Sequence, residues 1–155
     1  MSDPTHPRLD AAELAALDKK TEAAVALLER IAREHAPAAL ASSLGAEDMV
    51  LTDLIARHAP SIDLFVLDTG RLHEETYALI ARVEAHYGLR LRLFAPQAED
   101  VEAFVARHGI NGFYDSLEAR LACCDARKVR PLARALAGKR AWITGMRREQ
   151  SPTRS

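Results

Sequence analysis

The chain has 155 residues, 48% of them hydrophobic, and a formal net charge of −1; this length suits one compact domain with a real core and is short for two. The N-terminus lacks the basic start and apolar segment of a secretory signal, and no stretch approaches the roughly 18 uninterrupted apolar residues of a membrane helix. We therefore expect no membrane partner and a single cytoplasmic domain over residues 1–155.

Helical periodicity and strand-like apolar runs alternate along the chain. Asp10 and Glu13 have the spacing of a capping box, which opens an Ala- and Leu-rich helix that Pro37 ends, so residues 1–37 are predicted as an N-terminal helical segment. The strands are predicted at 38–42, 62–68, 89–94 and 140–145, and the further helices at 49–59, 73–87, 98–109 and about 123–137. This alternation is typical of parallel βαβ units and predicts an α/β fold, a parallel sheet flanked by helices.

Two loops follow predicted strands, at the edge where parallel sheets bind ligands. SSLGAED (42–48) opens a helix with small residues that let backbone N–H groups approach a phosphate or sulfate, although an ordinary strand-to-helix turn explains it equally. The loop lacks the GxxxxGK[ST] and GxGxxG spacings. LDTGRLH (67–73) offers Asp68 and Thr69 as hydrogen-bonding groups for a nucleotide and Arg71 as an anion clamp, against a plain turn.

A third loop, TGMRREQS (144–151), follows the last predicted strand. It places Gly145 at a close-approach position and follows it with Arg147 and Arg148, whose planar forks match phosphate or sulfate oxygens. A solvated basic loop is the alternative explanation.

The charges are unevenly distributed. Residues 119–155 carry ten Lys and Arg against two acids, whereas residues 1–118 carry eleven against twenty. A cationic segment on an acidic body indicates a site for a phosphate- or sulfate-bearing small molecule. A nucleic-acid-binding arm is the non-enzymatic alternative, but the cations are not interleaved with aromatic residues, Trp142 excepted, so we expect no nucleic-acid partner.

The two cysteines of the chain, Cys123 and Cys124, are adjacent. A bridge between neighbours closes almost no loop, so the pair indicates reactive chemistry or a metal rather than a structural disulfide. Neighbours on a helix point about 100° apart, so both thiols reach one metal cluster only where the backbone bends. Arg127, Lys128 and Arg130 would hold them as thiolates and offset the charge of an iron–sulfur centre. Two inert buried thiols and a redox-active pair are the alternatives.

Five stretches together resemble the assimilatory adenylyl-sulfate (APS) reductases, the iron–sulfur branch of the phosphoadenylyl-sulfate (PAPS) reductase family. They run through positions 42–155 and are SLGAED, LDTGRLHEETY, GFYDS, CCDARKVRPL and AWITGMRREQSPTRS. The resemblance implies an adenine nucleotide alpha hydrolase-like fold with a modified PP-loop that binds a sulfonucleotide. The substrate-binding positions it implies are Ser42, Ser43, Gly45, Ala46, Glu47, Asp48, Leu67, Asp68, Thr69, Gly70, Arg71, Gly145, Arg147 and Arg148.

The resemblance also implies a cofactor and a reaction. Cys123 and Cys124 correspond to two of the four ligands of a 4Fe-4S cluster, and Lys128 lies between cluster and substrate in a supporting catalytic role. The implied activity is thioredoxin-dependent reduction of APS to sulfite and AMP, in assimilatory sulfate reduction and cysteine biosynthesis. In this family a cysteine near the C-terminus attacks the sulfur of APS, AMP leaves, and thioredoxin releases sulfite from the enzyme S-sulfocysteine.

Two departures from the family pattern accompany the resemblance. The second cysteine pair and the nucleophile motif would fall beyond position 155, so we expect an N-terminal fragment without a catalytic cysteine. Leu44 directly precedes Gly45, where the usual loop has a glycine. The alternative enzymes are a PAPS-specific reductase and a PP-loop ATP pyrophosphatase or sulfurtransferase, and the sequence leaves a homo-oligomer open.

Overall fold

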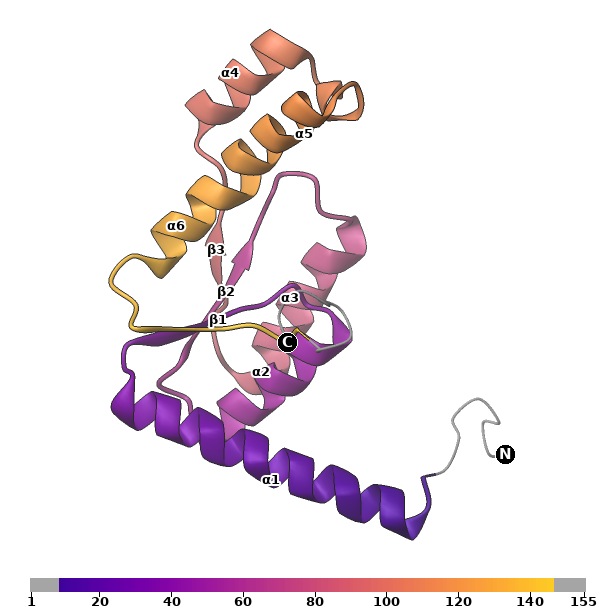
Figure 1. Ribbon diagram of the computed structural model, residues 1–155, viewed down its shortest axis with the longest axis vertical. Coiled ribbons are helices and arrows are strands. Elements are labelled where there is room, and N and C mark those ends of the chain that lie inside the picture. The colour runs from indigo at the N-terminus through magenta and orange to yellow at the C-terminus, as the bar shows by residue number, and fades with distance from the viewer. Residues whose placement is uncertain (1–8, 147–155) are drawn as a thin grey trace.

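The computed structural model describes residues 9–146 as one sheet with helices on both faces (Figure 1). The strands are β1 (Ala38–Ala41), β2 (Asp63–Leu67), β3 (Arg92–Phe94) and β4 (Ala141–Ile143). The helical elements are α1 (Ala11–Glu34), α2 (Ala46–His58), α3 (Glu74–Tyr87), α4 (Ala98–His108), η1 (Gly112–Tyr114), α5 (Leu117–Cys124), η2 (Asp125–Val129) and α6 (Arg130–Leu136). Among these described residues, no helix is both long and apolar enough to cross a bilayer.

The strands pair in the order β3-β2-β1-β4, and every pairing is parallel. β2 and β3 therefore lie on one side of β1 and β4 lies on the other, so the strand order reverses between β1 and β4. Sheets of this kind bind ligands at the carboxyl ends of the strands beside such a reversal. The predicted α/β class is confirmed, and the topology directs attention to the loops after β1, β2 and β4.

Alternating residues of each strand pack on opposite faces of the sheet. Leu40 of β1 belongs to the larger core, which α1, α2 and α3 cover, whereas the adjacent Ala39 belongs to the smaller core beneath α6. The larger core also contains Leu28, Ile55, Leu64, Val66 and Val83. In the smaller core Phe65 meets Phe94 edge to face, with ring centroids 5.7 Å apart.

Two helices begin earlier than the sequence predicted. α2 begins at Ala46, so Glu47 and Asp48 lie in its first turn and not in the preceding loop. α5 begins at Leu117 because the Ser116 hydroxyl oxygen accepts a hydrogen bond from the Ala119 amide, at 3.1 Å. The helix expected from position 123 is therefore the later part of a longer helical run, and the cysteines lie at a junction inside it.

β3 is shorter than the predicted strand at 89–94. Gly88 ends α3 in the left-handed conformation, at φ 64°. The following Leu91 amide donates to the Glu84 carboxylate at 2.9 Å, so it takes no part in strand pairing. Only Arg92–Phe94 pairs with β2, and β3 is an edge strand.

Candidate functional site

One buried carboxylate ties the loop after β1 to the segment after β4. Asp48 is 6% exposed, and its Oδ2 accepts hydrogen bonds from both the amide and the hydroxyl of Ser43, each at 2.6 Å. Its Oδ1 accepts from the Gly145 amide at 2.9 Å. Asp48 thus positions the loop after β1 and the segment after β4, which flank the reversal in strand order. The predicted contact of Asp48 with a ligand stays a prediction.

The loop after β1 satisfies most of its own amides. The Ser43 amide donates to Asp48, the Leu44 amide donates to the Ser42 hydroxyl at 3.1 Å, and the Gly45 amide donates to the Ser43 hydroxyl at 3.3 Å. At the N-terminal end of α2 the cap residue is Gly45, which has no side chain to accept hydrogen bonds from the amides of the first helical turn. Amides at such a helix end favour an anion. The phosphate or sulfate contacts predicted for this loop stay predictions.

Leu44 holds this loop in an uncommon backbone conformation. Its φ of 62° lies in the left-handed region that favours glycine. Its side chain is only 8% exposed and belongs to the larger core, so burial of the leucine offsets the backbone strain. Leu44, which stands where the usual PP-loop has a glycine, therefore anchors the loop after β1 to the core.

The loop after β2 is shaped by Asp68. Its Oδ1 accepts hydrogen bonds from the Gly70 amide at 2.9 Å and from the Tyr77 hydroxyl at 2.7 Å. Gly70 adopts φ 70°, which a turn of this kind requires and which glycine provides without strain. The hydrogen bond to Asp68 raises the pKa of the Tyr77 phenol. The predicted nucleotide contacts of Asp68 and Thr69 stay predictions, and the role visible for Asp68 is to fix the turn.

Arg71 connects this turn to the segment before α5. Its NH2 group donates to the Ile110 carbonyl oxygen at 2.7 Å and to Asn111 Oδ1 at 3.0 Å. Its guanidinium also lies over the Phe113 ring, 4.7 Å from the centroid. The sequence pattern predicted Arg71 as an anion clamp, but the contacts present here are a tether within the protein.

Two clefts open beside these loops. The first, here called the strand-end cleft, has a volume of about 420 Å³ and is lined by Ala41, Ser42, Ser43, Val66, Leu67, Thr69, Arg71, Leu72, Thr76 and Lys128. The second, here called the cysteine cleft, has a volume of about 300 Å³ and is lined by Thr69, Arg71, Phe113, Arg120, Cys123, Cys124, Arg127 and Lys128. The two share Thr69, Arg71 and Lys128, so a ligand in the strand-end cleft would lie next to the cysteines.

The cysteines lie where the helix changes its winding. Cys123 and Cys124 are free thiols of intermediate exposure at the end of α5, and the chain continues directly into the π-helical η2. Segments of this kind occur often at functional sites. Two neighbouring thiols reach one cluster only where the backbone bends, and the change from α to π winding supplies a departure from regular helix at that point.

Arg127 of η2 joins the cysteine segment to the loop after β2. The side chain is 8% exposed, and its NH1 group donates to the Thr69 carbonyl oxygen at 2.7 Å. Its Nε–H is buried and has no hydrogen-bond partner among the described residues. A buried donor without an acceptor costs free energy, and the hydrogen bond from NH1 to Thr69 offsets part of the cost of burying this guanidinium.

The cations around the thiols differ from those expected. Arg130 forms ion pairs with Asp125, at 2.8 Å, and with Asp100. The hydrogen bond to Asp125 raises the pKa of the Arg130 guanidinium, and the charge of Asp100 raises it further. These acids neutralise it, so the expectation that Arg130 serves the thiols is wrong. Arg120 takes its place, and sequence reasoning missed it. The available signal was spacing, because Arg120 precedes the cysteines by one helical turn.

The donor set fits part of a metal cluster. The cysteine cleft brings two thiols together with four cationic side chains and no acidic one. Over residues 9–146 no group of three or more His, Cys, Asp and Glu side chains is arranged to hold a metal ion. The pair therefore suits two ligand positions of an iron–sulfur cluster, whose remaining ligands would come from outside the described residues.

The segment after β4 carries the last predicted positions. A Cβ added at Gly145 would lie 2.3 Å from Asp48 Oδ1, so Asp48 approaches Gly145 closely, and the predicted contact of Gly145 with a nucleotide stays a prediction. Arg147 and Arg148, the predicted anion ligands, lie outside the described residues.

Comparison with known proteins identifies the family. Residues 37–155, which contain both clefts, match the family model described as the phosphoadenosine phosphosulfate reductase domain. The chain belongs to the phosphoadenosine phosphosulfate reductase family. This membership confirms the resemblance that the loops and the cysteine pair indicated.

Relatives within this reductase family carry a common name. A protein named adenosine 5'-phosphosulfate reductase from Allochromatium vinosum is 52% identical over 139 residues, which are 90% of this chain and 54% of that protein. The protein of the same name from Burkholderia cepacia is 51% identical over 143 residues, 92% of this chain and 56% of that protein. The chain thus spans about half the length of these curated relatives.

A solved structure supports the fold. The crystal structure of phosphoadenylyl-sulfate (PAPS) reductase from Candida auris, in a phosphate complex, superposes with a TM-score of 0.65 and 26% sequence identity. The match covers 90% of this chain and 70% of that one.

Proposed function

We propose that this chain forms the nucleotide-binding part of an APS reductase that uses thioredoxin to reduce APS to sulfite and AMP. The observation that carries the proposal is the pair of adjoining clefts, because Lys128 lines both the strand-end cleft and the cysteine cleft. The proposal is supported further by the shared name of relatives that are about half identical to this chain.

The chain's own residues would bind and polarise the substrate. A sulfonucleotide in the strand-end cleft would meet Ser42 and Ser43 of the loop after β1 and the ammonium group of Lys128, whose positive charge attracts an anion. A thiolate from outside this chain would attack the sulfur, the bond from sulfur to the phosphate oxygen would break, and AMP would leave with that electron pair. Lys128 would stabilise the charge that develops on the departing phosphate. The dithiol of thioredoxin would then supply two electrons and release sulfite.

The proposal includes a 4Fe-4S cluster with Cys123 and Cys124 as two of its ligands. When bound, such a cluster would supply an inorganic iron–sulfide centre held by thiolates beside the substrate. Within this chain, Arg120, Arg127 and Lys128 would lie beside the cluster and offset its negative charge.

A PAPS-specific reductase is the second candidate. It is supported by the description of the matching family and by the name of the Candida auris protein. APS is the substrate we propose, because the relatives of the higher identity are named for it. The two substrates differ by one phosphate, so affinity separates the candidates directly.

The proposal is tested by titration calorimetry of the 155-residue chain with APS, PAPS and ATP. We expect APS to bind more tightly than the other two. Lys128→Ala should weaken APS binding by roughly tenfold, because one cation beside the bound anion is lost. The control Lys19→Ala, on the exposed surface of α1, should leave the affinity for APS unchanged. Tighter binding of PAPS would favour the second candidate, and equal affinities for the wild type and Lys128→Ala would remove Lys128 from the site.

A further inference from the structure

The N-terminal half of α1 extends beyond the body of the domain (Figure 1). Residues 11–23, here called the overhang, are all exposed, whereas Leu28 further along the same helix is 3% exposed and lies in the larger core. At 1.5 Å per residue these thirteen residues form a rod of about 20 Å. Its sequence decides whether this rod is a solvated spacer or an interaction surface.

The overhang continues the apolar stripe that packs α1 on the core. The stripe follows alternating steps of three and four residues through Leu14, Leu17, Thr21, Ala24, Leu28 and Ile31. Its last three members contact the core, while Leu14 and Leu17 are 48% and 49% exposed. The Thr21 hydroxyl donates to the Leu17 carbonyl oxygen of its own helix at 3.0 Å, so it needs no outside partner. Helices with this spacing pair with one another through such a stripe.

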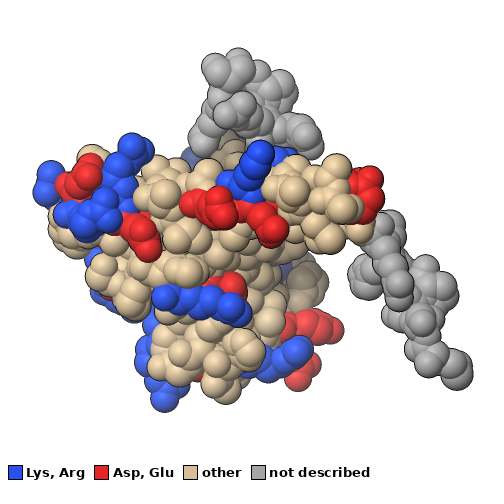
Figure 2. Space-filling model, turned by 90° about the horizontal axis from the view of Figure 1, so that it is seen from below, with Lys and Arg blue, Asp and Glu red and all other residues tan. Residues whose placement is uncertain are grey.

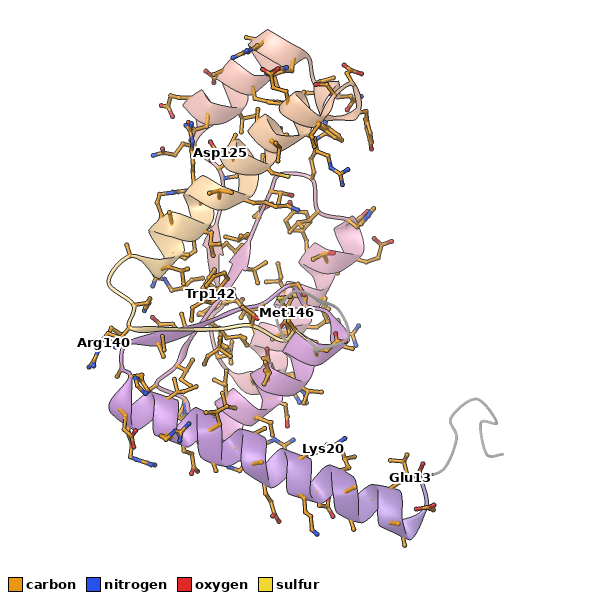
Figure 3. All side chains as sticks on the ribbon, in the orientation of Figure 1. Glu13, Lys20, Asp125, Arg140, Trp142 and Met146 are labelled. Carbon is orange, nitrogen blue, oxygen red and sulfur yellow. The ribbon has the colours of Figure 1, made fainter. Side chains whose placement is uncertain are left out.

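The charges beside the stripe select the partner. Glu13 and Lys20 are one heptad apart and therefore flank the stripe on the same side (Figure 3). If two such helices cross antiparallel with Leu14 of one opposite Leu17 of the other, Glu13 of each lies beside Lys20 of its partner. The capping box uses one oxygen of the Glu13 carboxylate, Oε2, to accept from the Asp10 amide. A copy of the same helix is thus complementary to it in both shape and charge.

We propose that the overhang is a self-association surface that pairs antiparallel with the overhang of a second copy of this chain. It buries two leucines from each copy and forms two Glu13–Lys20 ion pairs. A contact between two rods of about 20 Å is small beside a standard protein interface, so the dimer dissociates reversibly. The proposal uses no residue of either cleft and is independent of the proposed function.

Sedimentation velocity of the 155-residue chain over a range of concentrations tests the surface. We expect a concentration-dependent dimer. Leu17→Lys should weaken it by at least about tenfold, because it places two charges in the apolar contact. Leu93→Lys is the matched control, since Leu93 is also 49% exposed but lies on β3, and it should leave the dimer unchanged. A chain that stays monomeric throughout, or a dimer insensitive to Leu17→Lys, would overturn the proposal.

Charge exchange tests the antiparallel pairing. Glu13→Lys and Lys20→Glu should each weaken self-association, because like charges then face each other. An equimolar mixture of the two variants should associate again, since every cross-pair in the mixed dimer is of opposite sign. Circular dichroism of each variant checks that α1 is still helical. A mixture that associates no better than its components would rule out this pairing and favour a different occupant of the overhang.

Discussion

Gly145→Ala tests whether the link between the loops holds the candidate site together. An added Cβ would lie 2.3 Å from Asp48 Oδ1, 3.0 Å from the Asp48 amide nitrogen and 3.1 Å from the Glu47 carbonyl carbon, where ordinary contacts begin near 3.4 Å. Two of these three atoms belong to the backbone of α2 and move only with the helix. These backbone atoms require the segment after β4 to withdraw by about 0.4 Å, and clearing Asp48 Oδ1, whose carboxylate two hydrogen bonds from Ser43 hold in place, requires about 1 Å.

The magnitude follows from this withdrawal. The hydrogen bond from the Gly145 amide to Asp48, 2.9 Å long, would stretch beyond hydrogen-bonding distance. Loss of a bond to a charged acceptor costs about 1.5 to 3 kcal/mol, and residual overpacking adds about 1 kcal/mol or more. We expect the free energy of unfolding to fall by about 3 kcal/mol. In urea this lowers the midpoint by about 1.5 M for a typical slope of about 2 kcal/mol per M.

Urea denaturation followed by circular dichroism measures the effect, with Gly88→Ala as control. Gly88 has a left-handed φ of 64° and no atom within 4 Å of an added Cβ, so its substitution reports backbone strain alone and should cost about 1 kcal/mol. If Gly145→Ala destabilises the chain no more than Gly88→Ala does, the close approach does not hold the two loops, and the reasoning fails.

Two further substitutions test individual hydrogen bonds. Tyr77→Phe removes the donor to Asp68 and should lower the melting temperature by roughly 2 °C. Because folding raises the pKa of the phenol above 10.0, this difference from wild type should persist at neutral pH and fade as the pH rises through the folded-state pKa. The control Tyr114→Phe, at an 80% exposed position, should show no such difference. Glu84→Gln removes a carboxylate whose pKa is lowered below 4.5 by the Leu91 amide and then by a neighbouring arginine. The stability that this carboxylate contributes is present above that ordinary pKa and is lost as the pH falls through the folded-state value, so wild type and variant should converge in acid; a gap of constant size in pH-dependent melting curves would contradict this.

The fold could be predicted largely because its signals are local. The capping box of Asp10 and Glu13 acts within a few residues, and it is present as the sequence predicted. The start of α2 was misplaced because Asp48 was assigned to a loop. Its partner Gly145 lies 97 residues away, and no local pattern reveals that contact.

The arginines show why the site was harder to predict than the sheet. A guanidinium binds an anionic ligand and a protein carboxylate through the same kind of hydrogen bond, so composition does not tell which partner it meets. Arg71 meets carbonyl and amide oxygens 39 and 40 residues away, and Arg130 meets Asp100, 30 residues away. Figure 2 shows how Lys, Arg, Asp and Glu intermingle on the face seen from below. Only tertiary structure shows that Arg71 and Arg120 line the cysteine cleft whereas Arg130 does not.

The Asp48 link has a consequence for biosynthesis. During translation, β1, α2 and β2 leave the ribosome well before residue 145 is made. One of the three donors to the Asp48 carboxylate is still missing from that nascent intermediate. The loop after β1 therefore lacks its contact with the segment after β4 until β4 has been made and has added to the free edge of β1.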